Sequence, residues 1–338
     1  MNKFNFLVPV RSQSHLSYLK SINVDEHHYE FTQGKIIWTL QTYLILRNRM
    51  DGVTCTRFPK SDAINIAHCQ YLRKIQCEPH TFICSISGEY RHLFWAHMHI
   101  VQNQKQHDGK RYFWIPHWMQ PGLIPRKENR TVVDTVAYAG DPRRLSVRNN
   151  YLQSKIARFG YFTSKTDGND FWSAKINNMG MHFAFLQKPE WNDYSEIDIL
   201  VGIRSFDGER YNYLPPTKLI NAWHAGIPFI GGNDSAFEQV GTPGKDYIKV
   251  KSKEEAIQEI IRLRRDHEYY KSFVEAGMKQ AKEYTREKIA GAWIQLLTGD
   301  MQRIYNSWTQ KNIKVKKLNI SFFSGIENMI RRSGRWIT

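Results

Sequence analysis

Short apolar runs alternate with helical stretches along this chain, and that alternation limits its possible folds more than any other feature of the sequence. Strands that alternate with helices form mainly parallel sheets whose faces are covered by the helices. In the first half, we predict a helix over residues 35–49 and strands over residues 6–10, 53–56, 63–67, 81–85, 99–102 and 112–115. The first half is therefore expected to form an α/β domain.

A proline-containing stretch interrupts the pattern between residues 116 and 130. Prolines, a glycine and a polar run in this order are typical of a connector between domains. The alternation then resumes, with predicted helices over 152–159 and 218–225 and predicted strands over 135–139, 161–163, 182–186, 197–203 and 228–230. Ser252 and Glu255 form a capping box, which predicts the start of a further helix there. We therefore expect two α/β domains, residues 1–118 and 119–296, followed by a C-terminal helix and basic tail, residues 297–338.

The net charge of +16 is the one unusual feature of the composition. A positive field of this size favours polyanionic partners, such as nucleic acid, an anionic membrane or phosphorylated ligands. The sequence has no zinc-finger spacing, aromatic RNA-binding run or basic region with heptads, so we do not expect a nucleic-acid partner. No apolar run is long enough to span a bilayer or to form the core of a signal peptide, and we expect a cytoplasmic protein.

The four cysteines, Cys55, Cys69, Cys77 and Cys84, fall within one short stretch of the first half. Their spacing matches no common zinc or redox motif, and a chain of this length needs no disulfides to be stable. We therefore expect reduced thiols that pack in or near a core.

The segment over residues 214–240 gives the strongest indication of chemistry. Pro215 and Pro216 suit a helix start, where a missing N–H costs nothing, and Thr217 is placed to cap that turn. The unpaired N–H groups and the positive end of the helix dipole then form an anion site. Lys218 adds a cation to this first turn, which costs roughly a few tenths of a kcal/mol on a surface. An anionic ligand would offset that cost; the alternative is that Lys218 points into water.

The same segment, PPTKLINAWHAGIPFIGGNDSAFEQV, resembles the donor-site helix and following loop of GT-B glycosyltransferases. The runs AYAGD, YSEIDILVGIR and YFWIPHWMQPGLIPR resemble other parts of that fold, and the resemblance extends over about residues 112–296. The runs WTLQTYL and IPHW are also similar to those of bacterial, particularly cyanobacterial, glycosyltransferases of the family 1/4 type. The resemblance implies an α/β protein in which two Rossmann-like domains face each other across a cleft.

The resemblance also implies roles for single residues. The donor diphosphate would contact Arg204, Lys218 and the backbone at Thr217, and Gly140 and Asp141 would form the glycine turn of the opposite loop. Arginine and lysine suit a diphosphate leaving group, whose negative charge grows as the glycosidic bond breaks. No Asp-x-Asp metal motif is evident, so neither a metal nor another cofactor is implied.

Ribose and base would lie near Phe185 and Asn221, and Glu238 would contact a ribose or sugar hydroxyl. The sequence departs from the family pattern at one point. Many retaining GT-B enzymes carry two glutamates eight positions apart across this helix start, and Tyr213 and Asn221 occupy those places here. The stereochemistry of transfer therefore stays open.

The first half would then bind the acceptor and supply a base. Glu89 and His92 follow a predicted strand at its carboxyl end, where α/β sheets bind ligands, and either could accept the acceptor proton. His117 is a third candidate, beside the connector. The alternative for all three is a structural role in a turn or an ion pair, and Trp38 is expected to fill the core.

The basic tail and the overall function each leave alternatives. Residues 300–310 are expected to pack on the first domain, and residues 315–338 either do the same or lie on an anionic membrane as an amphipathic helix. The resemblance implies a glycosyltransferase that moves a sugar from a nucleotide-sugar to a glycan or lipid-linked acceptor, in cell-surface polysaccharide or glycolipid synthesis. A GT-B-like sugar-nucleotide epimerase and a non-enzymatic basic module that binds nucleic acid or membrane are the alternatives.

Overall fold

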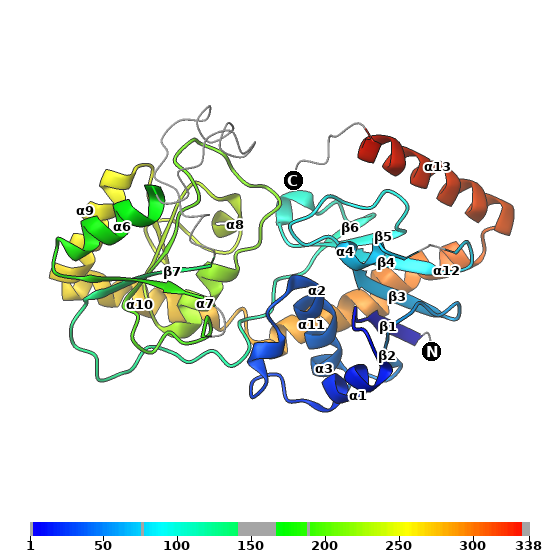
Figure 1. Cartoon of the computed structure of the whole chain (residues 1–338), viewed down its shortest axis with the longest axis horizontal. Coiled ribbons are helices and arrows are strands. Elements are labelled where there is room, and N and C mark those ends of the chain that lie inside the picture. The colour runs from blue at the N-terminus through cyan, green and yellow to red at the C-terminus, as the bar shows by residue number, and fades with distance from the viewer. Residues whose placement is uncertain (1–2, 76–77, 141–166, 188–189, 333–338) are drawn as a thin grey trace. The chain divides into compact units, whose positions relative to one another are not determined.

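The computed structural model describes residues 3–75, 78–140, 167–187 and 190–332. The chain divides into two compact units. Unit 1 contains Met1–His117, Tyr213–Pro215 and Arg286–Thr338, and unit 2 contains Trp118–Asn212 and Pro216–Thr285. Each unit is built on its own parallel sheet covered by helices, which confirms the predicted α/β class (Figure 1).

The sheet of unit 1 has six parallel strands in the order β2-β1-β3-β4-β5-β6. The strands are β1 (Lys3–Leu7), β2 (Val53–Thr56), β3 (Ala63–His68), β4 (Phe82–Ile86), β5 (Met98–Val101) and β6 (Tyr112–Trp114). The predicted strands agree with these within one residue except at the start of the chain, where the strand begins at Lys3 rather than at residue 6. The early start follows from Phe4 and Phe6, which are buried in the sheet, whereas Pro9 has no N–H for a ladder.

Helices cover both faces of this sheet. Between β1 and β6 they are α1 (Gln13–Ser21), a 3-10 turn (His28–Glu30), α2 (Gly34–Ile36), a π-helical turn (Ile37–Gln41), α3 (Thr42–Leu46), α4 (Cys69–Leu72) and a 3-10 turn (Gln104–Gln106). The predicted helix over 35–49 is thus one helical stretch with a π-helical turn inside it, but it begins at Gly34 and ends at Leu46, three residues earlier than predicted. Trp38 is 2% exposed, so the expectation that it fills the core is confirmed.

The chain returns to unit 1 at its C-terminal end. The elements there are α11 (Arg286–Leu296), a π-helical turn (Leu297–Met301), α12 (Gln302–Thr309) and α13 (Ile313–Arg332). Trp293 of α11 packs edge-on against Phe6, and Tyr305 and Trp308 of α12 pack against Phe82. The expectation that residues 300–310 pack on the first domain is therefore confirmed. Among the described residues, no helix is both long enough and apolar enough to cross a bilayer.

The sheet of unit 2 has five parallel strands in the order β11-β10-β9-β7-β8. The strands are β7 (Thr135–Ala139), β8 (His182–Leu186), β9 (Ile199–Gly202), β10 (Phe229–Gly231) and β11 (Ile248–Lys249). The helices are α6 (Asp167–Asn177), α7 (Thr217–Ala225), α8 (Ser235–Glu238), α9 (Lys253–Arg265) and α10 (His267–Ala281). The predicted helix over 152–159 and strand over 161–163 lie outside the described residues.

One face of this sheet packs against α6, α9 and α10 through a shared apolar core that includes Trp172, Ile199 and Ile260. Helix α9 begins as the capping pattern indicates, because Ser252 Oγ accepts a hydrogen bond of 3.1 Å from the N–H of Glu255. The carboxylate of Glu255 in turn accepts from the N–H of Lys251 at 2.7 Å. The local sequence therefore sets the start of α9.

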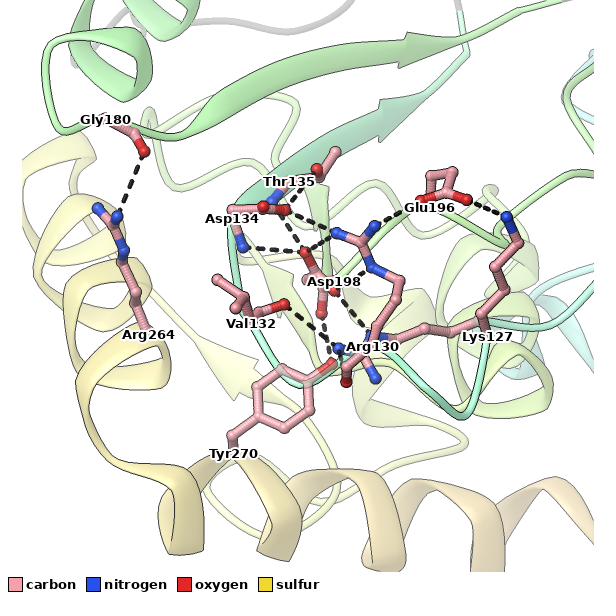
Figure 2. A network of polar contacts seen from close by, with 11 residues as sticks. Lys127, Arg130, Val132, Asp134, Thr135, Gly180, Glu196, Asp198, Arg264 and Tyr270 are labelled. Atoms are coloured by element: carbon pink, nitrogen blue, oxygen red, sulfur yellow. Dashed lines mark hydrogen bonds and ion pairs between the residues drawn. The ribbon is translucent and has the colours of Figure 1, made fainter.

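A buried carboxylate ties the connector to the amino-terminal edge of this sheet (Figure 2). Asp198 is fully buried, and it accepts hydrogen bonds from Arg126 at 2.8 Å, from Arg130 at 2.8 Å and from the N–H groups of Asp134 and Thr135, both at 2.9 Å. Burial alone would raise the pKa of Asp198, but these donors outweigh it and lower the pKa to about 2. Asp198 directly precedes β9, and its carboxylate therefore holds the first residues of β7 beside the first residues of β9.

The three described cysteines of unit 1 are structural. Cys55, Cys69 and Cys84 are buried free thiols, and burial raises the pKa of each above its usual value. A thiol that holds its proton is a poor nucleophile. The expectation of reduced thiols in a core is confirmed for these three, and Cys77 lies outside the described residues.

Candidate functional site

The strand order of unit 2 defines where a ligand is expected to bind. β8, the next described strand after β7, pairs with one side of β7, and β9 pairs with the other side. The order in which the described strands are added to the sheet therefore reverses between β7 and β9. Open α/β sheets bind ligands at such a point, beyond the carboxyl ends of the strands. Gly140 directly follows β7, and Arg204 comes two residues after β9. Both residues therefore lie at the edge where binding is expected.

Helix α7 begins next to this edge. Pro216 is its N-cap and makes no side-chain cap, and the first helical hydrogen bond runs from the N–H of Ile220 to the carbonyl of Pro216 at 3.1 Å. The expectation that Thr217 caps the turn is wrong, because Thr217 is already the first helical residue. Its Oγ1 is buried without a hydrogen-bond partner, although buried hydroxyls are normally paired. The helix start therefore offers N–H groups without helical partners and one unsatisfied hydroxyl.

Lys218 extends from this first turn toward the end of β7. Its ammonium lies 3.7 Å from the centre of the Tyr138 ring, and Tyr138 is fully buried in β7. The alternative that Lys218 points into water is therefore wrong. A cation over an aromatic face is held in place by the ring quadrupole. The ammonium is thus positioned beside the carboxyl end of β7 rather than left to move in solvent.

Gly140 keeps this position open. Its φ is +133°, a conformation that favours glycine, and a Cβ placed there would stand 3.6 Å from Lys218 Nζ. Its N–H donates to the carbonyl of Leu186 at 3.2 Å, so the turn continues the β7–β8 ladder by one bond. Gly140 and Lys218, which the resemblance assigns to opposite sides of a diphosphate, are therefore neighbours in the structure. Asp141 lies outside the described residues.

Phe185 belongs to the same group. It is half-buried near the end of β8 and packs edge-on against Tyr138, with ring centres 6.3 Å apart. A row of Phe185, Tyr138 and Lys218 thus runs across the ends of β8 and β7 to the start of α7. Aromatic surface next to a cation suits a ligand with a planar base and a phosphate.

Arg204 lies in a second group, formed by the loops after β9 and β10. Its Nε pairs with Asp234 at 3.3 Å, and its guanidinium lies 5.9 Å from the centre of the Tyr211 ring. The Tyr211 hydroxyl and Ser205 Oγ share a hydrogen bond of 2.7 Å. Tyr211 has a φ of +48°, which is a strained conformation for a residue with a side chain. This loop is held in an unusual shape by its own contacts, as is common in binding loops.

Two other predicted donor contacts are engaged elsewhere. Asn221 is 5% exposed, and its Oδ1 accepts from the N–H of Gln120 at 3.1 Å, so its amide holds the connector against α7. Glu238 pairs with Lys249 at 2.5 Å and with Arg210. Burial would raise the pKa of Glu238, but the two cations lower it below the usual value. Both residues support the loops around the site.

Helix α7 is firmly anchored, which fixes its N-terminus. Trp223 is buried, and its indole N–H donates to the carbonyl of Asp246 at 2.9 Å. Gly277 of α10 packs so closely on this indole that a Cβ there would stand 2.5 Å from the ring. Gly226, with a φ of +69°, ends the helix in the left-handed conformation that glycine favours. The N–H groups of the first turn are therefore held by a rigid element, as a binding site requires.

Unit 1 carries a histidine that was not among the predicted site residues. His68 is the last residue of β3, which pairs with β1. The strand order of this sheet reverses between β1 and β3, as it does between β7 and β9 in unit 2. Its Nδ1 accepts from the N–H of Gln70 at 3.3 Å, and burial, with the charges of Arg73 and Lys35, lowers its pKa to about 4. The imidazole is therefore neutral at neutral pH, with its proton on Nε2 and able to donate to a ligand.

The surroundings of His68 leave little room. Gly88 has a φ of +59°, and a Cβ there would come within 2.6 Å of His68 Nε2. The ring of Tyr90, which is exposed, lies edge-on 5.6 Å away. A sequence signal was present, because His68 directly follows a predicted strand and Gly88 lies in the loop after the next one. The carboxyl ends of adjacent parallel strands bring the two together.

Two of the predicted candidates in unit 1, His92 and His117, contact neighbouring side chains. His92 shares hydrogen bonds with Ser87 Oγ at 2.7 Å and with Gln106 at 3.3 Å, and burial, together with Arg111, lowers its pKa to about 4. Both ring nitrogens thus hold neighbouring loops. His117 lies edge-on against Trp38, with ring centres 4.7 Å apart, and Glu89 is half-buried in the turn after β4. Within the described residues, no three His, Cys, Asp or Glu side chains are grouped so that they could hold a metal ion.

Comparisons with known proteins show similarity in structure only. No protein-family model matches the chain, and no curated protein sequence matches it. The crystal structure of TarM, known from S. aureus, aligns with 76% of this chain at 11% identity and a TM-score of 0.47. That alignment spans 57% of the TarM chain.

Two further solved structures align over more of the chain. HepE from Anabaena, crystallised in complex with UDP-glucose, aligns with 88% of this chain and 98% of its own, at 10% identity and a TM-score of 0.47. Sucrose-phosphate synthase from Thermosynechococcus elongatus aligns with 89% of this chain and 88% of its own, at 12% identity and a TM-score of 0.49. Identities this low describe the course of the chain and no residue of the site.

Proposed function

We propose that this protein is a glycosyltransferase of the GT-B type, and that unit 2 binds the diphosphate of a nucleotide-sugar donor. The observation that carries the proposal is the start of α7, where Lys218 is held over Tyr138 and beside Gly140. These residues lie at the end of β7, next to the place where the strand order of the sheet reverses. The resemblance of residues 215–240 to a donor-site helix supports the same assignment. Helix N-termini bind phosphates because their N–H groups and dipole both favour an anion.

The chemistry that these groups support is departure of a nucleoside diphosphate. As the bond between the sugar and the diphosphate breaks, negative charge grows on the leaving oxygen. Lys218, the first-turn N–H groups of α7 and the hydroxyl of Thr217 are positioned to stabilise that charge, and Arg204 adds a second cation at the same edge of the sheet. Two cations and a helix dipole supply the positive charge that a metal ion would otherwise provide, so we propose a metal-independent reaction.

We propose that unit 1 binds the acceptor, a glycan or a lipid-linked sugar, at the carboxyl edge of its sheet. The neutral imidazole of His68 supports this proposal as a candidate hydrogen-bond donor at Nε2, and the exposed Tyr90 ring beside it is a surface on which a sugar can stack. The net charge of +16 favours association with the surface of an anionic membrane. We therefore place the enzyme in the cytoplasm, on the inner face of the membrane, in the synthesis of a cell-surface polysaccharide or glycolipid.

Thermal unfolding with a panel of sugar nucleotides tests this function. One of the UDP-, GDP- or ADP-sugars is expected to raise the melting temperature, because a ligand at about a hundred times its Kd stabilises the folded state by about 2.7 kcal/mol. Incubation of the protein with that donor and no acceptor should leave the configuration of the sugar unchanged. An epimerised sugar would instead show that the protein is an epimerase. Binding of RNA together with no response to any sugar nucleotide would contradict the proposal and favour a basic binding module.

A further inference from the structure

We propose that helix α13 and the cavity beside it form a docking site for an anionic phospholipid bilayer. This gives the membrane association proposed above a definite place in the fold, and it does not depend on the donor site of unit 2. Three observations carry it: a cavity with aromatic walls and a cationic lining, a helix with an exposed apolar stripe, and a position away from the binding edge of the sheet.

The cavity has a volume of about 280 Å³ and lies between α12, α13 and the sheet of unit 1. Its walls include the rings of Phe82, His97 and Trp308, which pack against one another with centres 4.9–5.5 Å apart. Ile320 and Phe323 of α13 complete the apolar part. These walls suit the glycerol and upper acyl region of a lipid rather than a sugar, which needs more polar partners.

Four cations line the same cavity: Arg111, Arg303, Lys311 and Lys316. No carboxylate is among the described lining residues. Arg111 lies 5.7 Å from the centre of the Phe323 ring and donates to the backbone carbonyls of Phe94 and Ala96. Lys316 lies 3.9 Å from the centre of the Trp308 ring. These contacts hold two of the charges beside the cavity. A cavity with apolar walls and only positive charges fits an amphiphile with an anionic headgroup.

The other face of α13 exposes a continuous apolar stripe. Val315, Leu318, Phe322 and Met329 are 45%, 69%, 64% and 66% exposed, and their spacing of three, four and seven residues places them on one side of the helix. Lys314 and Lys317 are exposed on the same helix. Large apolar side chains next to lysines are typical of a helix that lies in the interface of a membrane.

The position of the cavity separates it from the binding edge of unit 1. Phe82 is the first residue of β4, His97 directly precedes β5, and Arg111 directly precedes β6, so the cavity lies at the amino ends of these strands. His68 and Gly88 lie at the carboxyl ends. In a parallel sheet these are opposite edges. A membrane bound at α13 would therefore leave the proposed acceptor edge uncovered.

The charge of the segment selects the occupant. Between residues 311 and 332 there are six lysines and arginines and a single acid, Glu327. A second copy of the chain would bring six like charges against this helix, and a neutral surface would leave them uncompensated. An anionic bilayer matches both features at once, because its headgroups pair with the cations and its acyl region accepts the apolar stripe.

Sedimentation of the full-length protein with vesicles tests the proposal. We expect binding to phosphatidylcholine vesicles that contain phosphatidylglycerol, at least tenfold weaker binding to phosphatidylcholine alone, and weaker binding at high salt. Phe322→Ser should reduce the partition coefficient about tenfold, and Lys311→Gln with Lys316→Gln should reduce it about 25-fold, which corresponds to about fivefold per lysine. Phe58→Ser and the pair Lys74→Gln with Lys105→Gln are matched controls on unit 1 and should bind as the wild type does.

Four results would overturn the proposal. Equal binding to neutral and anionic vesicles would remove the role of the charges, and unchanged binding by both test variants would place the contact elsewhere. Stabilisation by glycerol phosphate that is lost in the lysine variant, without any binding to vesicles, would show a site for a soluble phosphate. A dimer that Phe322→Ser converts to a monomer, again without vesicle binding, would show a subunit interface. The sugar-nucleotide response, measured on the same samples, reports on the donor site separately.

Discussion

Replacement of Lys218 by alanine is expected to weaken binding of the donor nucleotide about tenfold to a hundredfold. A hydrogen bond to a charged group contributes about 1.5–3 kcal/mol, and each 1.4 kcal/mol changes the affinity tenfold. The loss of turnover should be larger than the loss of affinity, because the charge on the leaving diphosphate is greatest in the transition state. Isothermal titration with the sugar nucleotide that gives the largest thermal shift measures the first effect, and initial rates measure the second.

Lys279→Ala is the matched control for this experiment. Lys279 is exposed on α10 of the same unit, so the variant loses the same charge from another surface. We expect the control to bind the donor as the wild type does. If the two variants lose affinity equally, the effect comes from the overall positive field of the protein and not from the start of α7.

Asp198→Ala is expected to destabilise unit 2 by about 3–5 kcal/mol. The substitution removes the buried carboxylate that pairs with Arg126 and with Arg130, the second of which is labelled in Figure 2. Removing one partner of a buried ion pair costs about this much. It also leaves the N–H groups of Asp134 and Thr135 without their acceptor. A loss this large is a major part of the stability of a typical domain. Urea unfolding followed by circular dichroism measures it.

Glu196→Gln tests whether the loss of stability expected for Asp198→Ala depends on the burial of the Asp198 carboxylate. Glu196 pairs with Lys127 and Arg130 in the same network, but its side chain is 54% exposed. Exposed ion pairs contribute little to stability, so this variant should unfold almost as the wild type does. A loss in Asp198→Ala no larger than in Glu196→Gln would mean that the buried carboxylate does not organise the start of β7 and β9.

Much of the fold could be predicted because its signals are local. β2, β7 and β8 have the predicted bounds, since a strand that is buried between helices appears as an apolar run between polar loops. The capping box at Ser252 predicted the start of α9 for a similar reason. The first strand was placed too late because Val8 and Val10 continue the apolar run after β1 has ended at Leu7.

The site was less accessible to sequence reasoning, because its parts come from distant segments. Lys218 and Gly140 could be named from local patterns, but Tyr138, which holds the Lys218 ammonium, reads as an ordinary strand residue. Thr217 was predicted to be the N-cap of α7, but the N-cap is Pro216. Thr217 is the first helical residue, and its hydroxyl is buried without a hydrogen-bond partner. His68 and Gly88 meet only because β3 and β4 are adjacent and parallel. Contacts of this kind depend on strand order, which one sequence does not specify.

A crystal structure of the protein with its nucleoside diphosphate sugar tests the central claim most directly. The claim is that the first turn of α7 binds the donor diphosphate. We predict that diphosphate oxygens lie within about 3 Å of Lys218 Nζ and of at least one first-turn N–H group, with Gly140 facing the same phosphates. A diphosphate bound away from the start of α7, with Lys218 still resting on Tyr138, would contradict the account.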